Sequence, residues 1–344
     1  MNIVITDPVF IKKENKNVID RFFLKLINDE RDLPFIYLCL KITFLVVPAA
    51  VFLFVNKHIH WAFYVLYLVI NLAVFLGPFV LMLHNTSHRK FFKKEYGFLN
   101  NFIPWFLGLF YGQTPETYFY HHVGMHHAEN NMEDDLSSTM KYRRDSLRGF
   151  LHYLFTFYFF GIFQLSYYFK KKDQVKFLWR VLRGETFFII LTIALAFYNF
   201  TAALFILILP FIFIRFAMMA GNWAQHAFID RDEPDNLYKS SITCINTGYN
   251  KRCFNDGYHI GHHLKPSMHW TDMPGNFLQN LDKYENNDVV IFEGVDYFQI
   301  WFLLMIKNYK FLAKKFVSVS QNLRSEQEII DFLKSRTRYK FTSK

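Results

Sequence analysis

The histidines of this chain fall into groups whose spacing suits metal binding. Residues three or four positions apart on a helix share one face, so each group can direct two or three imidazole rings toward one point. A cluster of imidazole rings is unfavourable by itself, because protonated imidazoles repel each other and buried neutral ones each need a hydrogen-bond partner. The groups are the pair His84 and His88, the run His121, His122, His126 and His127, the set His259, His262 and His263, and His226 with Asn222 one turn before it.

Metal coordination meets both requirements, since neutral imidazole is a good ligand for iron, zinc or copper. The pattern HxxxHH is complete from His122, so His121 is set aside. The histidines outside the groups are interpreted as interfacial or loop residues without a metal role: His58, His60, His152 and His269. The rings that remain are too many for one ion and suit two ions with four or five ligands each. They are His84, His88, His122, His126, His127, His226, His259, His262 and His263.

The elements that must position these rings are long apolar runs. Apolar residues make up 52% of the chain and are concentrated in these runs, with the polar residues gathered between them. This distribution predicts one membrane-embedded domain with a polar cap rather than several soluble domains. A membrane crossing needs about 20 apolar residues. The sequence therefore predicts transmembrane helices at 35–56, 61–83, 186–201 and 203–220.

Two further apolar segments are expected to lie at the membrane surface. The segment 102–112 is too short to cross, and it is expected to form an interfacial or re-entrant helix. The segment 150–169 could span or lie flat. If it lies flat, every Lys and Arg except Lys41, Arg215 and Lys57 falls on one side of the membrane. If it crossed, the basic segment 170–183 would be translocated, against the positive-inside tendency. We therefore expect both termini and all the histidine groups to be cytoplasmic.

The positive net charge is also explained by the predicted membrane topology. The value of +10 comes from residues that flank the apolar runs and not from a separate basic arm, so it indicates a topogenic signal rather than nucleic-acid binding. The chain is thus expected to be an all-α integral membrane protein with four transmembrane helices, interfacial helices and a cytosolic histidine-rich cap.

Three parts of the chain are expected. They are a cytosolic N-terminal segment (1–34), the membrane domain (35–275) and cytosolic or interfacial C-terminal helices (276–344). Within the last part, the segment 297–316 pairs an apolar face with lysines, as an interface-lying helix does. The segment 325–340 has the pattern of an amphipathic soluble helix.

The order and spacing of the histidine groups relative to the spans resemble those of the membrane fatty-acid desaturase and hydroxylase superfamily, over roughly residues 35–275. The resemblance rests on His84-Asn-Thr-Ser-His88, His122-Val-Gly-Met-His126-His127, His259-Ile-Gly-His262-His263 and Asn222-Trp-Ala-Gln-His226. It implies a di-iron centre that activates O2 and removes hydrogen from a methylene group of a lipid chain. It also makes the nine histidines the iron ligands and lets Asn222 act through a metal-bound water. Asp256 and Glu129 become candidate acceptors for the N–H groups of ligand rings.

The same resemblance leaves two reactions open. Asn85 stands where many desaturases have Asp after the first histidine, and the stretch 121–138 also resembles membrane alkane hydroxylases, in which an acidic, Ser-rich loop follows a similar cluster. We expect desaturation of a fatty-acyl chain, as acyl-lipid or acyl-CoA. The alternative is a di-iron hydroxylase or monooxygenase of fatty acids, alkanes or carotenoids. A membrane metal transporter is the alternative outside enzymes, but it should place its ligands at the bilayer midplane.

Electrons for either reaction are expected to come from another protein. The chain carries no HPGG motif of a cytochrome b5-like domain, no flavin fingerprint and no CxxC pair for a rubredoxin knuckle. A separate donor is implied, which is a ferredoxin, a cytochrome b5-like protein or a rubredoxin. The basic segments 89–94 and 170–172 are candidates for docking this donor, although such segments also anchor to anionic lipid headgroups.

Overall fold

A computed structural model describes residues 3–319 and 324–338 of the chain. Its architecture is mostly helical, and four helices within these ranges are long and apolar enough to cross a membrane: Glu30–Val55, Trp61–His88, Val175–Tyr198 and Phe200–Gln225. The predicted all-α membrane protein with four transmembrane helices is thereby confirmed. The third helix is longer than expected, because the basic residues from Lys176 to Arg183 continue the apolar run as helix.

The chain divides into two compact units, and neither is continuous in sequence. Unit 1 contains residues 1–9, 125–164 and 217–344, while unit 2 contains residues 10–124 and 165–216. Each unit carries part of the histidine groups, and each is described by itself.

Three of the four long helices change their hydrogen-bonding pattern part-way along. The first consists of η1 (Glu30–Asp32), α2 (Leu33–Lys41), the π-helical η2 (Ile42–Val46) and α3 (Val47–Val55). The second consists of α4 (Trp61–Ile70), the π-helical η3 (Asn71–Leu76) and α5 (Gly77–His88). The fourth consists of α11 (Phe200–Ala203), the π-helical η7 (Leu204–Ile208) and α12 (Leu209–Gln225).

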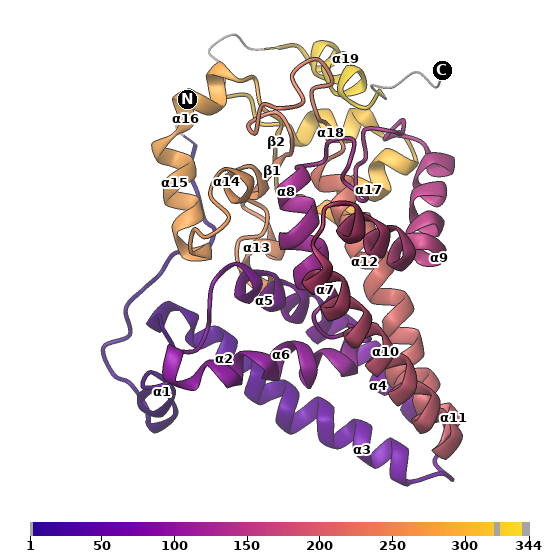
Figure 1. The fold of residues 1–344 in the computed structure, drawn as a ribbon. Coiled ribbons are helices and arrows are strands. Elements are labelled where there is room, and N and C mark those ends of the chain that lie inside the picture. Colours follow the sequence, from indigo (N-terminus) through magenta and orange to yellow (C-terminus); the bar gives the residue numbers. More distant parts are fainter. Residues whose placement is uncertain (1–2, 320–323, 339–344) are drawn as a thin grey trace. The chain divides into compact units, whose positions relative to one another are not determined.

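Proline explains these π-helical stretches. Pro48, Pro78 and Pro210 each stand just after one of them, and a proline cannot donate the backbone hydrogen bond that the preceding turn requires. The turns before the prolines are wider, since the backbone N–H of Val47 donates to Ile42 O and that of Leu209 donates to Leu204 O. The third long helix, α10 (Val175–Tyr198), contains no proline and is α-helical throughout (Figure 1).

The remaining elements of unit 2 are short. The segment expected as an interfacial or re-entrant helix forms two pieces, α6 (Phe102–Trp105) and η5 (Leu107–Tyr111). Gly112 ends η5 with φ +69° and lies against the backbone of Phe211, so a side chain could not replace its hydrogen. The others are α1 (Val18–Phe23), η4 (Lys94–Asn101) and α7 (Thr117–His121), after which η6 (His122–His126) and α8 (His127–Glu129) lead into unit 1.

Unit 1 is built around two apolar clusters and a small sheet. Strands β1 (Thr243–Ile245) and β2 (Ile291–Glu293) pair in parallel, which the sequence did not predict. One cluster lies around Phe292, Tyr297 and Leu304, and the other around Tyr258, Ile260 and Phe277. The surrounding helices are α13 (Gly248–Arg252), α14 (His259–Leu264), η8 (Trp270–Asp272), α15 (Met273–Gln279), α16 (Leu281–Asn286), α17 (Tyr297–Met305), α18 (Tyr309–Lys315) and α19 (Glu326–Arg336).

The C-terminal region departs from prediction in one place. The segment 297–316 forms two helices, α17 and α18, instead of one, because Lys307 adopts a left-handed conformation (φ 55°) between them. Its apolar residues Ile300, Leu304 and Leu312 are buried in the core of unit 1, while Phe302 and Ile306 are exposed. The position of this segment at the membrane interface stays a prediction. Helix α19 lies inside the predicted segment 325–340, whose last two residues are outside the described residues.

The ambiguous segment 150–169 lies inside α9 (Leu147–Lys171), a single helix of 25 residues. Among the described residues, this helix is not one of the four that are apolar enough to cross a membrane. Its position at the membrane surface stays a prediction.

Candidate metal centre

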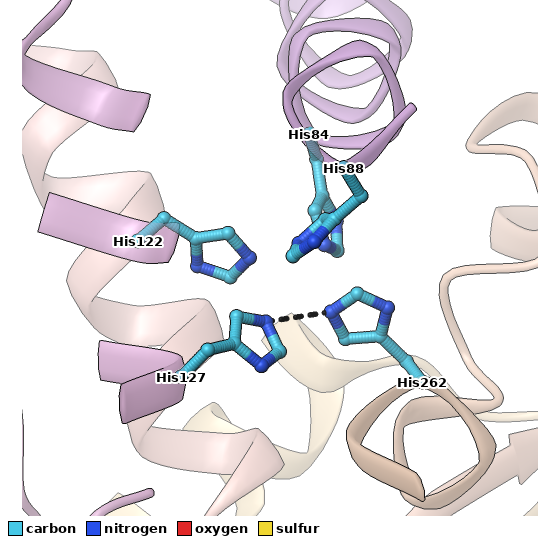
Figure 2. Close-up of side chains that lie close together, drawn as sticks. All are labelled: His84, His88, His122, His127 and His262. Carbon is cyan, nitrogen blue, oxygen red and sulfur yellow. Dashed lines mark hydrogen bonds between the residues drawn. The ribbon is translucent and has the colours of Figure 1, made fainter. Parts of the chain in front are cut away.

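Three histidines of unit 2 face one another. His84 and His88 lie one turn apart on α5, and His122 is the first residue of η6. Their ring centroids are separated by 5.2 Å (His84 to His88), 4.6 Å (His84 to His122) and 5.1 Å (His88 to His122). Each ring offers a nitrogen within 4.8 Å of those of the other two, and Figure 2 shows the three side chains converging. This arrangement can hold one metal ion from three sides.

The segment before His122 is fixed by polar contacts to α10. The hydroxyls of Thr114 and Thr117 donate to Glu185 Oε1 at 2.6 and 2.9 Å. Close packing reinforces these contacts, because Gly184 of α10 lies so near the Pro115 carbonyl oxygen that a Cβ would overlap it. The position of His122 is therefore set by the third long helix.

Four histidines of unit 1 form a second cluster. The Nε2 atom of His259 lies 3.4 Å from Nε2 of His226 and 3.0 Å from Nε2 of His263. A nitrogen of His126 joins those of His226 and His263 within 4.8 Å. All four rings are buried, with exposed fractions of 2% for His126, 0% for His226, 2% for His259 and 6% for His263.

These separations match shared coordination. With metal–nitrogen bonds of about 2.0–2.1 Å, two nitrogens on one ion lie about 3.0–3.4 Å apart at ordinary ligand angles. Two further histidines of unit 1, His127 and His262, meet with their Nε2 atoms 2.9 Å apart, as the dashed line in Figure 2 marks. In each unit, the histidine nitrogens therefore suit a metal ion that prefers imidazole ligands.

Polar partners turn the rings of the four-histidine cluster inward. His226 Nδ1 lies 2.8 Å from the Ser240 carbonyl oxygen, which can only accept a hydrogen bond. His263 Nδ1 lies 3.0 Å from Asn130 Oδ1. In both neutral rings the proton is thus on Nδ1, and the lone pair is on Nε2, which faces the cluster. Such outer contacts are typical of metal-binding histidines.

His126 has the strongest of these partners. Its Nδ1 lies 2.7 Å from Asp135 Oδ2, which also accepts from the Asn131 backbone N–H at 2.8 Å. The other oxygen accepts from the backbone N–H and the hydroxyl of Ser137 at 2.7 and 2.9 Å. Burial alone would raise the pKa of Asp135, but His126 and Ser137 lower this pKa to about 2. The carboxylate is therefore ionised at neutral pH.

Burial keeps the rings of His226 and His263 neutral. Burial, and then the neighbouring His126, lowers the pKa of His226 to about 3. Burial and the adjacent histidines hold the pKa of His263 well below its usual value. Neutral imidazole is the form that binds a metal.

The loop before α14 is fixed by a buried amide. Asn250 Nδ2 donates to the Cys244 carbonyl oxygen at 2.9 Å, and Asn250 Oδ1 accepts from the Gly257 N–H at 2.9 Å. Gly257 lies too close to these groups for any Cβ. The Tyr297 hydroxyl donates to the Gly257 carbonyl oxygen at 2.9 Å. His259, two residues on, is thereby held at the start of its helix.

One expectation about the histidine groups is corrected. Each sequence group was expected to aim at one point, but His122 lies with His84 and His88, while His126 lies with His226 and His263. Residues four apart on a helix are separated by about 6 Å along its axis, so successive turns face different neighbours. The set on α14 divides likewise, since His262 lies with His127, and His259 with His226.

The other predicted residues have defined surroundings. Asn222 Nδ2 donates to the Ser137 carbonyl oxygen at 2.9 Å and to the Tyr153 hydroxyl at 2.8 Å. Asp256 accepts from the Tyr249 hydroxyl at 2.7 Å and from Gln225 Nε2 at 3.3 Å. Glu129 ends α8. Direct support of a ligand ring by Asp256 or Glu129 stays a prediction.

The sequence analysis missed Asp135. The signal was the acidic, Ser-rich loop, but spacing alone did not show which of its carboxylates would fold back onto His126. The histidines set aside have other contacts. His60 and His269 accept from backbone N–H groups at the starts of α4 and η8. His152 lies 3.2 Å from the Tyr142 hydroxyl. Among the described residues, neither His121 nor these three belongs to a metal-sized group.

Comparison with known families agrees with this site. The sequence model of the family described as Fatty acid desaturase matches residues 59–295. The chain belongs to the fatty acid desaturase family. It is therefore a membrane enzyme of the fatty-acid desaturase and hydroxylase type, and all nine predicted ligand histidines lie within the matched desaturase region. Neither the comparison with curated proteins nor that with solved structures returned a match.

Proposed function

We propose that this protein is an O2-dependent di-iron oxidoreductase that desaturates a fatty-acyl chain of a membrane lipid or of acyl-CoA. The observation that carries the proposal is the four-histidine cluster of unit 1, whose Nε2 separations of 3.0 and 3.4 Å suit a shared ion. Iron rather than zinc is inferred from the family, because O2-dependent oxidation requires a redox-active metal and zinc has no redox chemistry.

The nine histidines are assigned to two irons. His126, His226, His259 and His263 of unit 1 would hold one iron, and His84, His88 and His122 of unit 2 are candidate ligands of an iron in that unit. His127 and His262, which meet within unit 1, are the remaining two proposed ligands. Asn222, one turn before His226, would act on a metal-bound water through its amide oxygen, because its amide nitrogen already donates to Ser137 and Tyr153. When bound, the irons supply the reduction of O2 that removes hydrogen from an unactivated methylene group.

The chain's own residues orient and protect this centre. Asp135, Ser240 and Asn130 fix the ring orientations of His126, His226 and His263. Burial of the four rings excludes water, which protects reactive species from side reactions. The protein thus supplies buried ligand rings whose orientation is fixed by their outer hydrogen-bond partners.

Hydroxylation is the second candidate reaction. The acidic, Ser-rich loop that resembles alkane hydroxylases contributes Asp135, Ser137 and Ser138 around His126. This loop is therefore part of the candidate site, and its resemblance to the loop of alkane hydroxylases supports hydroxylation as the alternative reaction. The position of the substrate methylene decides between loss of a second hydrogen and addition of oxygen.

The electron donor is proposed to dock on the cytoplasmic side. Of the two basic segments considered, 89–94 is partly occupied, because Arg89 pairs with Asp29 at 3.0 Å and Lys93 donates to the Lys25 carbonyl oxygen at 2.9 Å. Lys170, Lys171 and Lys172 at the end of α9 are exposed. We favour the segment 170–172 for an acidic ferredoxin, cytochrome b5-like protein or rubredoxin, because it presents three consecutive exposed lysines.

Metal analysis combined with lipid products tests the proposal. The purified protein should contain about two irons per chain, and cells that express it should accumulate a lipid that has lost two hydrogen atoms. A product heavier by one oxygen atom would instead establish hydroxylation. His262→Ala should abolish turnover and leave membrane insertion intact, whereas the control His152→Ala should retain both iron and activity. A fully active preparation without iron would refute the proposal.

A further inference from the structure

Tyr153 of α9 lies against two groups that the candidate site uses. Its hydroxyl oxygen is 2.8 Å from Asn222 Nδ2 and 3.2 Å from the Ser137 carbonyl oxygen. Asn222 Nδ2 also donates to this carbonyl oxygen, at 2.9 Å. The three groups therefore form a closed triangle of hydrogen bonds within unit 1.

The chemistry of the three groups fixes the direction of each hydrogen bond. A carbonyl oxygen can only accept, and an amide nitrogen can only donate. The Tyr153 hydroxyl must therefore accept from Asn222 Nδ2 and donate its own proton to the Ser137 carbonyl oxygen. The Asn222 amide cannot be turned over, because its oxygen would then face the carbonyl oxygen, which has no proton to donate.

This orientation leaves the amide oxygen of Asn222 outside the triangle. Among the described residues, no group donates a hydrogen bond to this oxygen. The Asn222 backbone carbonyl accepts from the His226 N–H at 3.1 Å, so the amide and a proposed ligand ring belong to one turn of backbone. The amide oxygen is thus available to accept from a metal-bound water, as the proposed function requires.

The Ser137 corner of the triangle leads to His126. The backbone N–H and the hydroxyl of Ser137 both donate to Asp135 Oδ1, and Asp135 Oδ2 lies 2.7 Å from His126 Nδ1. The Tyr153 hydroxyl thus holds the carbonyl of the residue whose other polar groups hold this carboxylate. Such outer contacts fix the orientation of ligand rings and so affect metal affinity.

The Tyr153 ring is itself held in place by packing. The side chain is buried, and its ring centroid lies 5.1 Å from that of Trp223 and 5.7 Å from that of Tyr142. Trp223 is fixed in turn, because its Nε1 donates to the Arg144 carbonyl oxygen at 2.9 Å. The Tyr153 hydroxyl is therefore a stable support for the groups that it contacts.

We propose that Tyr153 is a positioning residue that sets the metal affinity of the four-histidine cluster. Its hydroxyl does so by holding the Asp135 loop against His126 and the Asn222 amide in one orientation at the same time. The inference deepens the proposed function and rests on it in one respect, namely that the cluster binds a metal ion. Tyr153 acts through Ser137 and Asn222 and not on the metal itself.

Titration of the purified metal-free protein with Co²⁺ tests this role without iron chemistry. The visible absorption bands of bound Co²⁺ depend on its coordination geometry, so the titration gives both an affinity and a spectrum. Tyr153→Phe keeps the ring and removes the hydroxyl. It should weaken one cobalt site about tenfold, at the lower end of the usual cost of losing an outer partner, and it should change the bands of that site.

Tyr142→Phe is the matched control. Tyr142 belongs to the same group of packed rings, but its hydroxyl lies 3.2 Å from His152 Nδ1. This variant should keep the cobalt affinity and the spectrum of the wild type. If Tyr153→Phe does not fold, Tyr153→Met replaces it, because methionine fills irregular core space without a hydroxyl. It too should weaken the cobalt site.

A double variant tests the route by which Tyr153 acts. Tyr153→Phe and Asp135→Asn both disturb the support of His126, so their losses of cobalt affinity should be less than additive when they are combined. Fully additive losses would separate Tyr153 from this support and overturn the inference.

Two further results would overturn it. Wild-type affinity and spectrum in Tyr153→Phe, with or without a lower thermal unfolding midpoint, would show that the hydroxyl serves folding only. An equal loss of affinity in Tyr142→Phe would assign the effect to ring packing. None of these results affects the proposed function, whose failure would appear as missing iron or missing product. A wild-type protein that binds neither cobalt nor iron would refute both.

Discussion

The carboxylate of Asp135 illustrates how a residue that is not a ligand can decide metal affinity. It accepts from His126 Nδ1 at 2.7 Å, and Ser137 occupies its other oxygen. Asp135→Asn should therefore weaken metal binding about 10- to 100-fold, the usual cost of removing an outer partner. Titration of the purified metal-free protein with Fe²⁺ or Co²⁺ measures this loss directly.

The matched control lies in the same loop. Glu133 is exposed, so Glu133→Gln changes the same charge without contact to a ligand ring. It should leave the metal affinity unchanged. Equal affinities for Asp135→Asn and the wild type would show that His126 needs no support from this carboxylate.

The buried neutral rings make stability depend on pH. The pKa of His226 is about 3 in the folded protein and 6.5 when unperturbed. Between these values the unfolded chain binds a proton that the folded chain does not, so stability rises with pH and falls on acidification. Lowering the pH from about 7 to about 5 should destabilise the metal-free protein by about 1 kcal/mol per pH unit for each such ring.

The thermal unfolding midpoint in detergent, followed across this pH range, measures the effect. His226→Gln should flatten the dependence, because it removes one of the titrating rings. His152→Gln should leave the slope as it is. A midpoint of the wild type that stays constant from about pH 7 to about pH 5 would contradict the assignment of neutral buried rings.

Much of the candidate site could be predicted at the residue scale. Dense groups of histidine are rare in sequences, so the candidate metal ligands could be selected without a structure. The division of each group between two clusters could not be predicted, because it depends on which neighbour each turn of helix faces. Asp135 was missed for the same reason, since a loop brings it back to His126.

At the scale of the element, alanine substitutions of two glycines in long helices are expected to have opposite effects on stability. A Cβ on Gly184 of α10 would overlap the Pro115 carbonyl oxygen, whereas a Cβ on Gly221 of α12 meets nothing within 4 Å. Gly184→Ala should therefore lower stability by about 1–3 kcal/mol, because helix and loop must move apart. Gly221→Ala should be neutral or stabilise by up to about 1 kcal/mol, as alanine favours helix.

Thermal unfolding of both variants in one detergent gives the comparison. Gly184→Ala should also lower the metal content, since the loop it displaces leads to His122. If both variants unfolded at the wild-type temperature, the loop from Gly112 to Thr117 would not depend on contact with α10.

The fold was predictable to the extent that apolarity and length determine it. The four long helices were found because a membrane crossing requires them. The start of α10 was missed, because charged residues can extend a helix beyond the apolar core. The strands β1 and β2 have three residues each, too few for an alternating pattern. The break between α17 and α18 was not predicted, because the left-handed residue there is Lys307 and not a glycine.

For the whole molecule, the number of crossings decides the topology. Four crossings place both termini on one side of the membrane, and five would place them on opposite sides. The choice depends on α9, whose exposed aromatic residues Phe159 (66%), Phe163 (70%) and Tyr167 (69%) follow the spacing of one helical face. An aromatic face flanked by basic residues is typical of a helix that lies in the interface. We therefore expect α9 not to cross.

Labelling at the two ends of α9 tests this topology. Arg148 and Asp173 are exposed near its start and just after its end, and the native cysteines are buried. In sealed vesicles of known orientation, Arg148→Cys and Asp173→Cys should react with a membrane-impermeant maleimide from the same side, which is the cytoplasmic one. Lys57→Cys, in the link between the first two long helices, should react only from the other side. Protection of either Arg148→Cys or Asp173→Cys on the cytoplasmic side would mean that α9 crosses, and that the basic residues after it are translocated against the positive-inside tendency.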